Sequence, residues 1–193
     1  LPGVEIRIAD PDPSTGEGEI LLRGPMVMQG YYKDPEKTAE ILSPDGWFRT
    51  GDLGCLDAEG YLSIKGRSKN VIIGPSGENI YPEIIESVIN RSEAVQESLV
   101  YEQQGRLVAR VHLNYDALDA FIKEKKLSPS QIREYIHKTL EDIKTKVNEG
   151  VSSFSRLSRG VEQTEPFEKT PTQKIKRYLY VERMIDGEEA IRV

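Results

Sequence analysis

The chain has 193 residues, which is enough for one large domain or two small ones with a buried core. Its charge is unevenly distributed, because residues 1–65 carry 6 Lys and Arg against 12 Asp and Glu, whereas residues 66–193 carry 20 of each. The net charge of −6 argues against general nucleic-acid binding, which needs a basic face to displace counterions from phosphates. The contrast between the two parts indicates two different units.

Residues that bind transition metals are scarce. Cys55 is the single cysteine, so no internal disulfide can form, which fits a reducing, cytoplasmic location. His112 and His137 have no Cys or His at ligand spacing, so we expect no transition-metal site.

No apolar run approaches the roughly 20 residues of a membrane-spanning helix and no signal peptide is visible, which leaves only peripheral membrane contact open. The chain starts at Leu1 inside a strand-like run, without a methionine, so we expect a fragment of a longer protein.

The first 65 residues favour strands. Residues 3–9 alternate with period two, and a polar turn at residues 11–16 separates them from a returning strand at residues 18–23. Asp34 and Pro35 predict a short helix, because aspartate is a preferred N-cap and proline a preferred first helical residue. Two further strands are predicted at residues 47–57 and 60–65.

The second part of the chain mixes helices and strands. A helix is predicted over residues 82–90, and a longer one over residues 129–150, where Ser128 and Gln131 form a capping box. The apolar face of the first helix is made of Ile84, Ile85, Val88 and Ile89. Residues 71–73 form a short apolar run that the polar residues 74–77 stop, and strands are predicted at residues 107–113 and 156–164. The first of these strands alternates apolar and polar residues, which is typical of a strand buried on one face.

Two charged residues in the first 67 are candidates for holding a ribose. Asp52 follows a predicted strand, and a carboxylate there can accept hydrogen bonds from two vicinal hydroxyls. An isolated Gly-Asp pair is more often a turn that the aspartate caps. Arg67, at the junction of the two parts, either reaches ribose or phosphate oxygens through its fork of donors or forms an ordinary surface ion pair. Clefts between units are common ligand sites, which favours binding.

Two later segments have features of an anion site. The loop at residues 74–79 contains two glycines, which let backbone amides approach a ligand, although by itself it is more often a plain hairpin turn. It is not a P-loop, because the chain has no Gly-x-x-x-x-Gly-Lys-Ser/Thr motif. A basic run follows near the end of the chain, made of Lys169, Lys174, Lys176 and Arg177. Such runs are usually solvated, yet one lysine can draw a carboxylate and a phosphate together without any proton transfer.

In order along the chain, these segments resemble the adenylate-forming superfamily, which includes acyl-CoA synthetases, firefly luciferase and peptide-synthetase adenylation domains. The resemblance runs through GEILLRG (18–24), GYYKDPEKT (30–38), FRTGDLG (48–54), IKGRSKN (64–70) and EKTPTQKIKR (168–177) to Leu179. It is strongest to long-chain fatty-acid–CoA ligases. It implies an α+β fold, with residues 1–66 as the β-rich end of the large N-terminal domain. Residues 67–193 are then the small mobile C-terminal domain, a mixed sheet flanked by helices.

The resemblance also implies roles for single residues. Asp52 matches the acid that holds the ribose hydroxyls, Arg67 the arginine that assists it, and Ile64 an apolar neighbour of the ribose. Lys69 matches the hinge about which the small domain rotates. Lys174 matches the lysine that bridges the substrate carboxylate and the α-phosphate. The loop that faces the pantetheine channel of coenzyme A after rotation matches Gly74, Ser76, Gly77 and Glu78.

The implied activity is that of an AMP-forming acyl-CoA synthetase, which uses ATP, coenzyme A and Mg²⁺ to activate a fatty acid, here expected to be long. The phosphate loop, the Mg²⁺-binding glutamate and the acyl pocket belong to the preceding domain in this family. Its own N-terminal domain is therefore the expected partner, and the chain alone is expected to be inactive. Two residues depart from the family pattern, because Gln173 stands where glycine is usual and Asn70 where aspartate is common.

Other functions fit the same residues. A carrier-protein ligase or a luciferase-like oxidase would use the same ribose contacts with a different acceptor. A non-catalytic binding module is slightly favoured by Gln173, whereas the intact Asp52, Arg67 and Lys174 argue against it. A nucleic-acid binder that uses residues 169–177 is disfavoured, because the run is short and residues 66–193 have no net charge.

Overall fold

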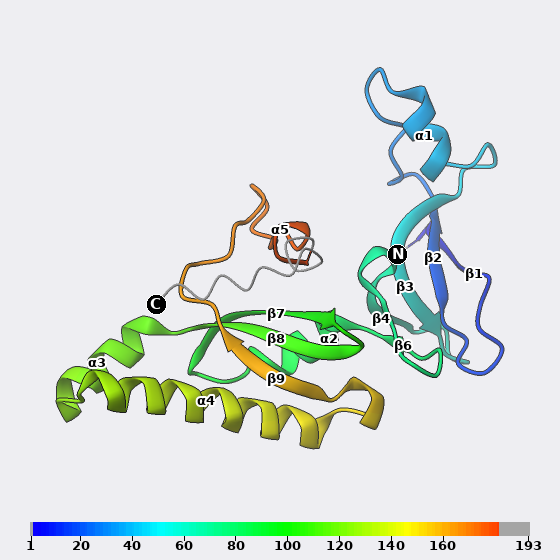
Figure 1. Cartoon of the computed structure of the whole chain (residues 1–193). Helices are drawn as coiled ribbons and strands as arrows, with labels where there is room; N and C mark the ends of the chain where they lie inside the picture. Colours follow the sequence, from blue (N-terminus) through cyan, green and yellow to red (C-terminus); the bar gives the residue numbers. More distant parts are fainter. Residues whose placement is uncertain (1, 182–193) are drawn as a thin grey trace. The chain divides into compact units, whose positions relative to one another are not determined.

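The computed structural model describes residues 2–181 of the chain (Figure 1). The chain divides into two compact units between Val71 and Ile72. This division lies beyond residue 66, where the sequence predicts the domain boundary, because the last strand of the first unit runs on to Arg67 and a 3₁₀ turn follows over Ser68–Asn70. The assignment of the two units to a large domain and a small mobile domain stays a prediction.

The first unit is a four-stranded antiparallel sheet in the order β1-β2-β3-β4. Its strands are β1 (Glu5–Ala9), β2 (Gly18–Arg23), β3 (Phe48–Leu56) and β4 (Leu62–Arg67), close to the predicted ranges. Helix α1 (Pro35–Ile41) begins at the predicted N-cap, where Asp34 Oδ1 accepts a hydrogen bond from Lys37 N at 3.0 Å. Within residues 2–71, Ile20 and Leu21 are the only buried apolar side chains, so this unit has little core of its own.

The second unit is a mixed three-stranded sheet flanked by helices. β7 (Val95–Gln103) and β8 (Arg106–Leu113) are antiparallel, and β9 (Leu157–Glu162) runs parallel to β8. The parallel pair is linked by α3 (Tyr115–Lys125), α4 (Pro129–Gly150) and a 3₁₀ turn (Ser153–Ser155). The unit starts with the hairpin β5 (Ile72–Ile73) and β6 (Asn79–Ile80), followed by α2 (Pro82–Ile89), and its last described element is α5 (Tyr178–Val181). This architecture confirms the α+β prediction.

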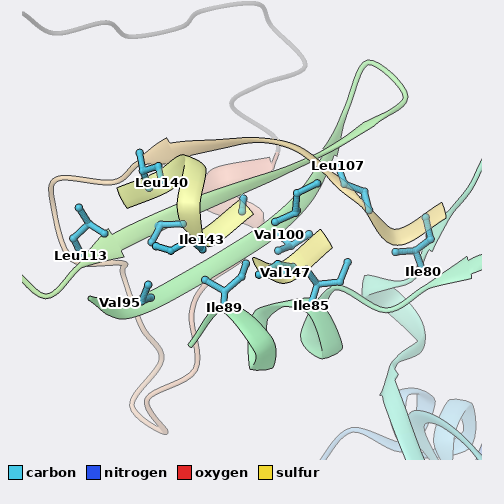
Figure 2. Packing of buried hydrophobic residues seen from close by; sticks show 13 residues of the cluster. Ile80, Ile85, Ile89, Val95, Val100, Leu107, Leu113, Leu140, Ile143 and Val147 are labelled. Atoms are coloured by element: carbon cyan, nitrogen blue, oxygen red, sulfur yellow. The ribbon is translucent and has the colours of Figure 1, made fainter. Parts of the chain in front are cut away.

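Helices α2 and α4 pack on one face of this sheet and form the main core with it (Figure 2). Figure 2 shows Ile85 and Ile89 of α2 close to Val147 of α4 and Val100 of β7. Each of these four side chains is at most 2% exposed. Burial of such apolar surface is the main favourable term in folding, so the second unit has the core that the first one lacks.

The long helix α4 begins as the sequence predicts. Ser128 N donates a hydrogen bond to Gln131 Oε1 at 2.9 Å, and Gln131 N donates one to Ser128 Oγ at 3.4 Å, which completes the capping box. None of the helices within residues 2–181 is long and apolar enough to cross a membrane.

Two predictions of burial are wrong. The sequence predicts Ile84 on the apolar face of α2, but this side chain is 44% exposed, because the helix packs against the sheet through a narrower stripe. The sequence also predicts that β8 is buried on one face, yet Val108 and His112 on its second face are buried as well. β8 is the central strand, and the segment after β9 contacts that second face, because His112 Nδ1 is hydrogen-bonded to Gln163 O at 2.8 Å.

A partly buried phenol ties the start of α3 to the end of β9. Tyr115 Oη donates a hydrogen bond to Glu162 Oε1 at 2.6 Å. Burial, reinforced by this carboxylate, raises the pKa of the Tyr115 hydroxyl. The folded protein therefore keeps the phenol protonated at pH values near 10, where the unfolded chain ionises it. The stability that Tyr115 contributes is present below about pH 10 and is lost as the pH rises above that value.

We expect Tyr115→Phe to lower the free energy of unfolding by about 0.5–1.5 kcal/mol at neutral pH, because one hydrogen bond is lost. The variant should also lose less stability than the wild type as the pH rises past about 10, because it has no phenol to ionise in the unfolded state. Urea unfolding of both proteins across this range measures the difference. If the unfolding free energies of the wild type and the variant change in parallel with pH, the phenol ionises normally in the folded protein.

Candidate functional site

Asp52 lies within strand β3 at a bulge and does not cap a turn. The pairing of β3 shifts register against both of its neighbours in this region. Gly51 has a φ of +71°, which favours glycine. Thr50 Oγ1 donates a hydrogen bond to Ile20 O at 2.8 Å and accepts one from Asp52 N at 3.0 Å. Because bulges change the direction of nearby side chains, this one sets the direction of the Asp52 carboxylate.

Glu19 supports the bulge from the neighbouring strand β2. Its Oε1 accepts a hydrogen bond from Gly51 N at 3.2 Å, and its carboxylate also forms an ion pair with Arg49. The side chain of Glu19 is mostly buried, with 17% exposed. Glu19 therefore holds the backbone next to Asp52, a role that we did not predict from the sequence.

Asp52 and Arg67 face each other across β3 and β4. They are register partners, and Arg67 Nε lies 3.1 Å from Asp52 Oδ1. Arg67 Nη1 also donates a hydrogen bond to Thr50 O at 2.9 Å. Both side chains stay well exposed, 37% for Asp52 and 49% for Arg67, and within residues 2–181 Asp52 Oδ2 has no hydrogen-bond partner. The structure thus brings the two predicted ribose-binding residues together and leaves one carboxylate oxygen available.

The two other predicted residues of the first unit lie near its end. Ile64 is on β4 and is 67% exposed, which leaves an apolar surface available for contact. Lys69 lies in the 3₁₀ turn that follows β4, two residues before the division between the units. The ribose contact of Ile64 and the hinge role of Lys69 stay predictions.

The loop at Gly74–Glu78 joins β5 to β6 and is a hairpin turn, as the simpler interpretation of the sequence predicts. Gly74 N donates a hydrogen bond to Glu78 O at 2.8 Å, and Ser76 N donates one to Glu78 Oε2 at 3.1 Å. A Cβ at position 74 would lie 2.6 Å from Glu78 Oε2, so the Glu78 side chain would have to move if this residue were larger. Gly77 has a φ of +90°, where glycine is needed for conformation.

Lys174 lies on a small hairpin that residues 168–176 form after β9. Thr170 N donates a hydrogen bond to Lys174 O at 2.8 Å, and Lys176 N donates one to Glu168 O at 2.8 Å. Gln173, at the tip, has a φ of +62°. Glycine adopts this left-handed conformation without cost, whereas other residues do so at about 1–2 kcal/mol. The glycine that is usual in the family thus suits a conformation that Gln173 adopts here.

The other cations of the basic run are all engaged in ion pairs. Lys169 Nζ lies 2.6 Å from Glu97, Lys176 Nζ lies 3.4 Å from Glu168, and Arg177 pairs with Glu86. Lys174 is exposed, and its ammonium has no partner within the part of the chain that the structure describes. Lys174 is therefore the cation of this run that is available to an anionic ligand.

The predicted site residues fall into both units. Asp52, Ile64, Arg67 and Lys69 belong to the first unit, and the Gly74–Glu78 loop and Lys174 belong to the second. Within residues 2–181, no group of three or more His, Cys, Asp or Glu residues is placed to hold a metal ion.

Known proteins similar to this chain are acyl-activating enzymes. The chain is 31% identical over 99% of its length to the long-chain-fatty-acid–CoA ligase FadD15 of Mycobacterium tuberculosis, and covers 33% of that protein. It is 38% identical over 83% of its length to long-chain-fatty-acid–CoA ligase 5 of the mouse, and covers 26% of it. The chain thus spans about a third or less of these relatives.

A solved structure shares the fold. The o-succinylbenzoate CoA synthetase MenE of Bacillus subtilis, in complex with the acyl-adenylate intermediate OSB-AMP, matches with a TM-score of 0.68 and 26% identity. The match covers 92% of this chain and 33% of that one. No family model matches the chain.

The geometry at Gly51 gives a test of the Asp52–Arg67 pair. A Cβ at position 51 would lie 3.3 Å from Arg67 Nη1 and would require a left-handed conformation. We expect Gly51→Ala to cost about 1–2 kcal/mol of stability. If Asp52 and Arg67 hold a nucleotide, the variant should also bind AMP more weakly, because Arg67 Nη1 must shift beside the added Cβ. Calorimetry with AMP on the complete protein measures the second effect.

Gly60→Ala is the matched control. Gly60 has a similar φ of +83°, but no atom lies within 4 Å of an added Cβ. It should lose comparable stability and keep the wild-type affinity for AMP. Equal AMP affinities in the two variants would contradict a role of the Asp52–Arg67 geometry in nucleotide binding.

Proposed function

Because this chain belongs to the adenylate-forming superfamily, of which it matches the C-terminal part, we propose that it serves an AMP-forming acyl-CoA synthetase that activates a long-chain fatty acid. A carboxylate oxygen attacks the α-phosphorus of ATP, and the bond to pyrophosphate breaks, so that acyl-AMP and pyrophosphate form. The thiolate of coenzyme A then attacks the acyl carbon, and AMP leaves. The observation that carries the proposal is that the ammonium of Lys174, unlike the three other cations of the run, has no partner among the described residues 2–181.

Lys174 acts in the first half-reaction as a fixed positive charge. The carboxylate and the α-phosphate are both anions, and they repel each other as they approach. An ammonium between them offsets this repulsion and stabilises the charge that builds up in the transition state. This role needs no proton transfer, and it suits a lysine that has no ion-pair partner in the described part of the chain.

Asp52 and Arg67 hold the ribose of the nucleotide in this proposal. Asp52 Oδ1 is oriented by Arg67, and Oδ2 is left to accept a hydrogen bond from a ribose hydroxyl. The exposed apolar side chain of Ile64 provides a surface beside the sugar. Glu19 and Thr50 keep the bulge in the geometry that this contact requires.

The second half-reaction uses a different part of the same unit. Rotation about Lys69 carries Lys174 away and brings the Gly74–Glu78 loop to the acyl-adenylate and the pantetheine channel of coenzyme A. Domain rotation of this kind allows one site to serve two reactions. Mg²⁺ would neutralise phosphate charge when bound, and we place its ligands in the preceding part of the enzyme.

The exposed apolar surface of the first unit supports the proposal that this unit is part of a larger enzyme. This unit buries only two apolar side chains within residues 2–71, while Met26, Met28 and Tyr32 are exposed. A unit of this size without a core is not expected to be stable alone. We propose that the N-terminal domain of the same protein covers this surface, that the chain alone is inactive, and that the enzyme is cytoplasmic.

We expect Lys174→Ala in the complete enzyme to lower the rate of acyl-AMP formation from ATP and fatty acid by at least about 100-fold. Thioester formation from preformed acyl-adenylate should keep its wild-type rate, because Lys174 has left the site by then. Rapid-quench measurement of each half-reaction separates the two. Lys176→Ala is the matched control and should leave both rates unchanged, because Lys176 pairs with Glu168.

Other outcomes would favour other functions. Loss of adenylation in Lys176→Ala rather than Lys174→Ala would move the catalytic charge by two positions. If the wild-type enzyme forms acyl-AMP but transfers the acyl group only to a carrier protein, then the carrier protein, and not coenzyme A, is the acceptor. If the wild-type enzyme catalyses neither half-reaction, the chain belongs to a non-catalytic module.

A further inference from the structure

A buried ion pair anchors the end of the Lys174 hairpin to the sheet. Arg177 Nη1 lies 2.7 Å and 3.0 Å from the two carboxylate oxygens of Glu86. Arg177 Nη2 donates a hydrogen bond to Val100 O at 2.7 Å, and Val100 N donates one to Glu86 Oε1 at 2.6 Å. We name these three residues the edge clamp. Only 19% of the Arg177 side chain and 12% of the Glu86 side chain are exposed.

The edge clamp satisfies backbone groups that the sheet leaves unpaired. Among the described strands β7 is an edge strand that pairs with β8 alone, so some of its N–H and C=O groups point away from the sheet. Buried backbone groups need partners, and here Val100 finds both of them in charged side chains. Burial raises the pKa of the Glu86 carboxyl, and the Arg177 guanidinium opposes this rise.

The edge clamp joins the two segments that act in different half-reactions. Glu86 is on α2, which follows the Gly74–Glu78 loop and β6 directly. Arg177 lies three residues after Lys174, at the base of its hairpin. A second contact holds the same base, because Tyr180 Oη accepts a hydrogen bond from Glu168 N at 2.7 Å. The tip with Lys174 is exposed, so its position depends on these contacts at the base.

We propose that Glu86 and Arg177 are positioning residues for Lys174, and that the edge clamp fixes the lysine relative to the Gly74–Glu78 loop. The inference rests on the proposed function. When the second unit rotates, the Gly74–Glu78 loop would then replace Lys174 at the substrate, while the distance between the loop and the lysine stays constant. A lysine displaced by about 1 Å can cost on the order of 100-fold in rate, so the edge clamp matters mainly where Lys174 acts.

A purely structural role gives a different expectation. If the edge clamp only stabilised the unit, its loss would lower the melting temperature and the fraction of folded enzyme. Both half-reactions would then fall together in proportion to that fraction. A positioning role lowers adenylation selectively and leaves the thioester half-reaction of the folded enzyme unchanged.

The test compares Arg177→Met, Arg177→Lys and Glu86→Gln in the complete enzyme, with both half-reactions measured per folded molecule. We expect Arg177→Met to lower acyl-AMP formation about 10- to 100-fold and to leave thioester formation from preformed acyl-adenylate unchanged. Arg177→Lys should recover only part of the loss, because an ammonium lacks the fork that reaches Glu86 and Val100 together. Glu86→Gln keeps the shape of the clamp and covers the case in which Arg177→Met does not fold.

Controls distinguish failure of this inference from failure of the proposed function. Lys176→Met removes a neighbouring cation from an exposed pair and should change neither half-reaction. If Lys174→Ala abolishes adenylation while the clamp variants retain it, the edge clamp is not a positioning device and the function stands. Equal losses in both half-reactions would also overturn the inference. If Lys174→Ala keeps adenylation, the proposed function fails, and the positioning role fails with it.

Amide hydrogen exchange gives a readout without activity. Thr170 N–H is hydrogen-bonded to Lys174 O, so it reports the closure of the hairpin. A positioning role predicts faster exchange at Thr170 in Arg177→Met, with unchanged exchange in the core of α4. Unchanged protection at Thr170 would contradict it.

Discussion

The buried ion pair between Glu86 and Arg177 connects three parts of the second unit at one point. Helix α2 supplies the carboxylate, the segment after β9 supplies the guanidinium, and the edge of β7 supplies the Val100 backbone that both of them bind. Removing one partner of a buried pair typically costs about 3–5 kcal/mol, because the other charge is left unpaired. The pair is thus strongly constrained as long as the unit stays folded.

The Asp52–Arg67 pair of the first unit has the opposite character. Both side chains are exposed, and exposed ion pairs typically contribute about 0–1 kcal/mol to stability. Its geometry comes instead from the bulge, which Glu19 holds through the Gly51 backbone. One ion pair therefore orients groups for a ligand, and the other fixes a segment in place. Their burial, rather than their chemistry, separates the two roles.

The sequence predicts the elements whose signals are local. Ser128 marks the start of α4, and the turns of the first unit mark its strands. β7 has no clear signal, because it is buried on both faces and its polar and apolar residues do not alternate. Helix α3 has no clear apolar pattern either, because Leu118 is its one buried residue, although Asn114 caps its first turn.

The functional residues also divide into those that a local segment of the sequence indicates and those that only long-range contacts reveal. Asp52, Arg67 and Lys174 stand in segments that resemble known ones. The structure shows the first two in contact, and the third has no partner among residues 2–181. Glu19 and Glu86 act on residues far along the chain, at Gly51 and Arg177, so only the folded structure reveals them.

The left-handed conformation of Gln173 changes what the position before Lys174 must satisfy. A glycine there meets a requirement of the backbone and contributes no chemistry. Asparagine and aspartate tolerate the same region better than most residues, and a glutamine adopts it here at a modest cost. A sequence pattern that demands glycine at this point would therefore reject chains whose lysine hairpin has the same shape. The angle φ, and not the identity of the residue, is the property to compare among relatives.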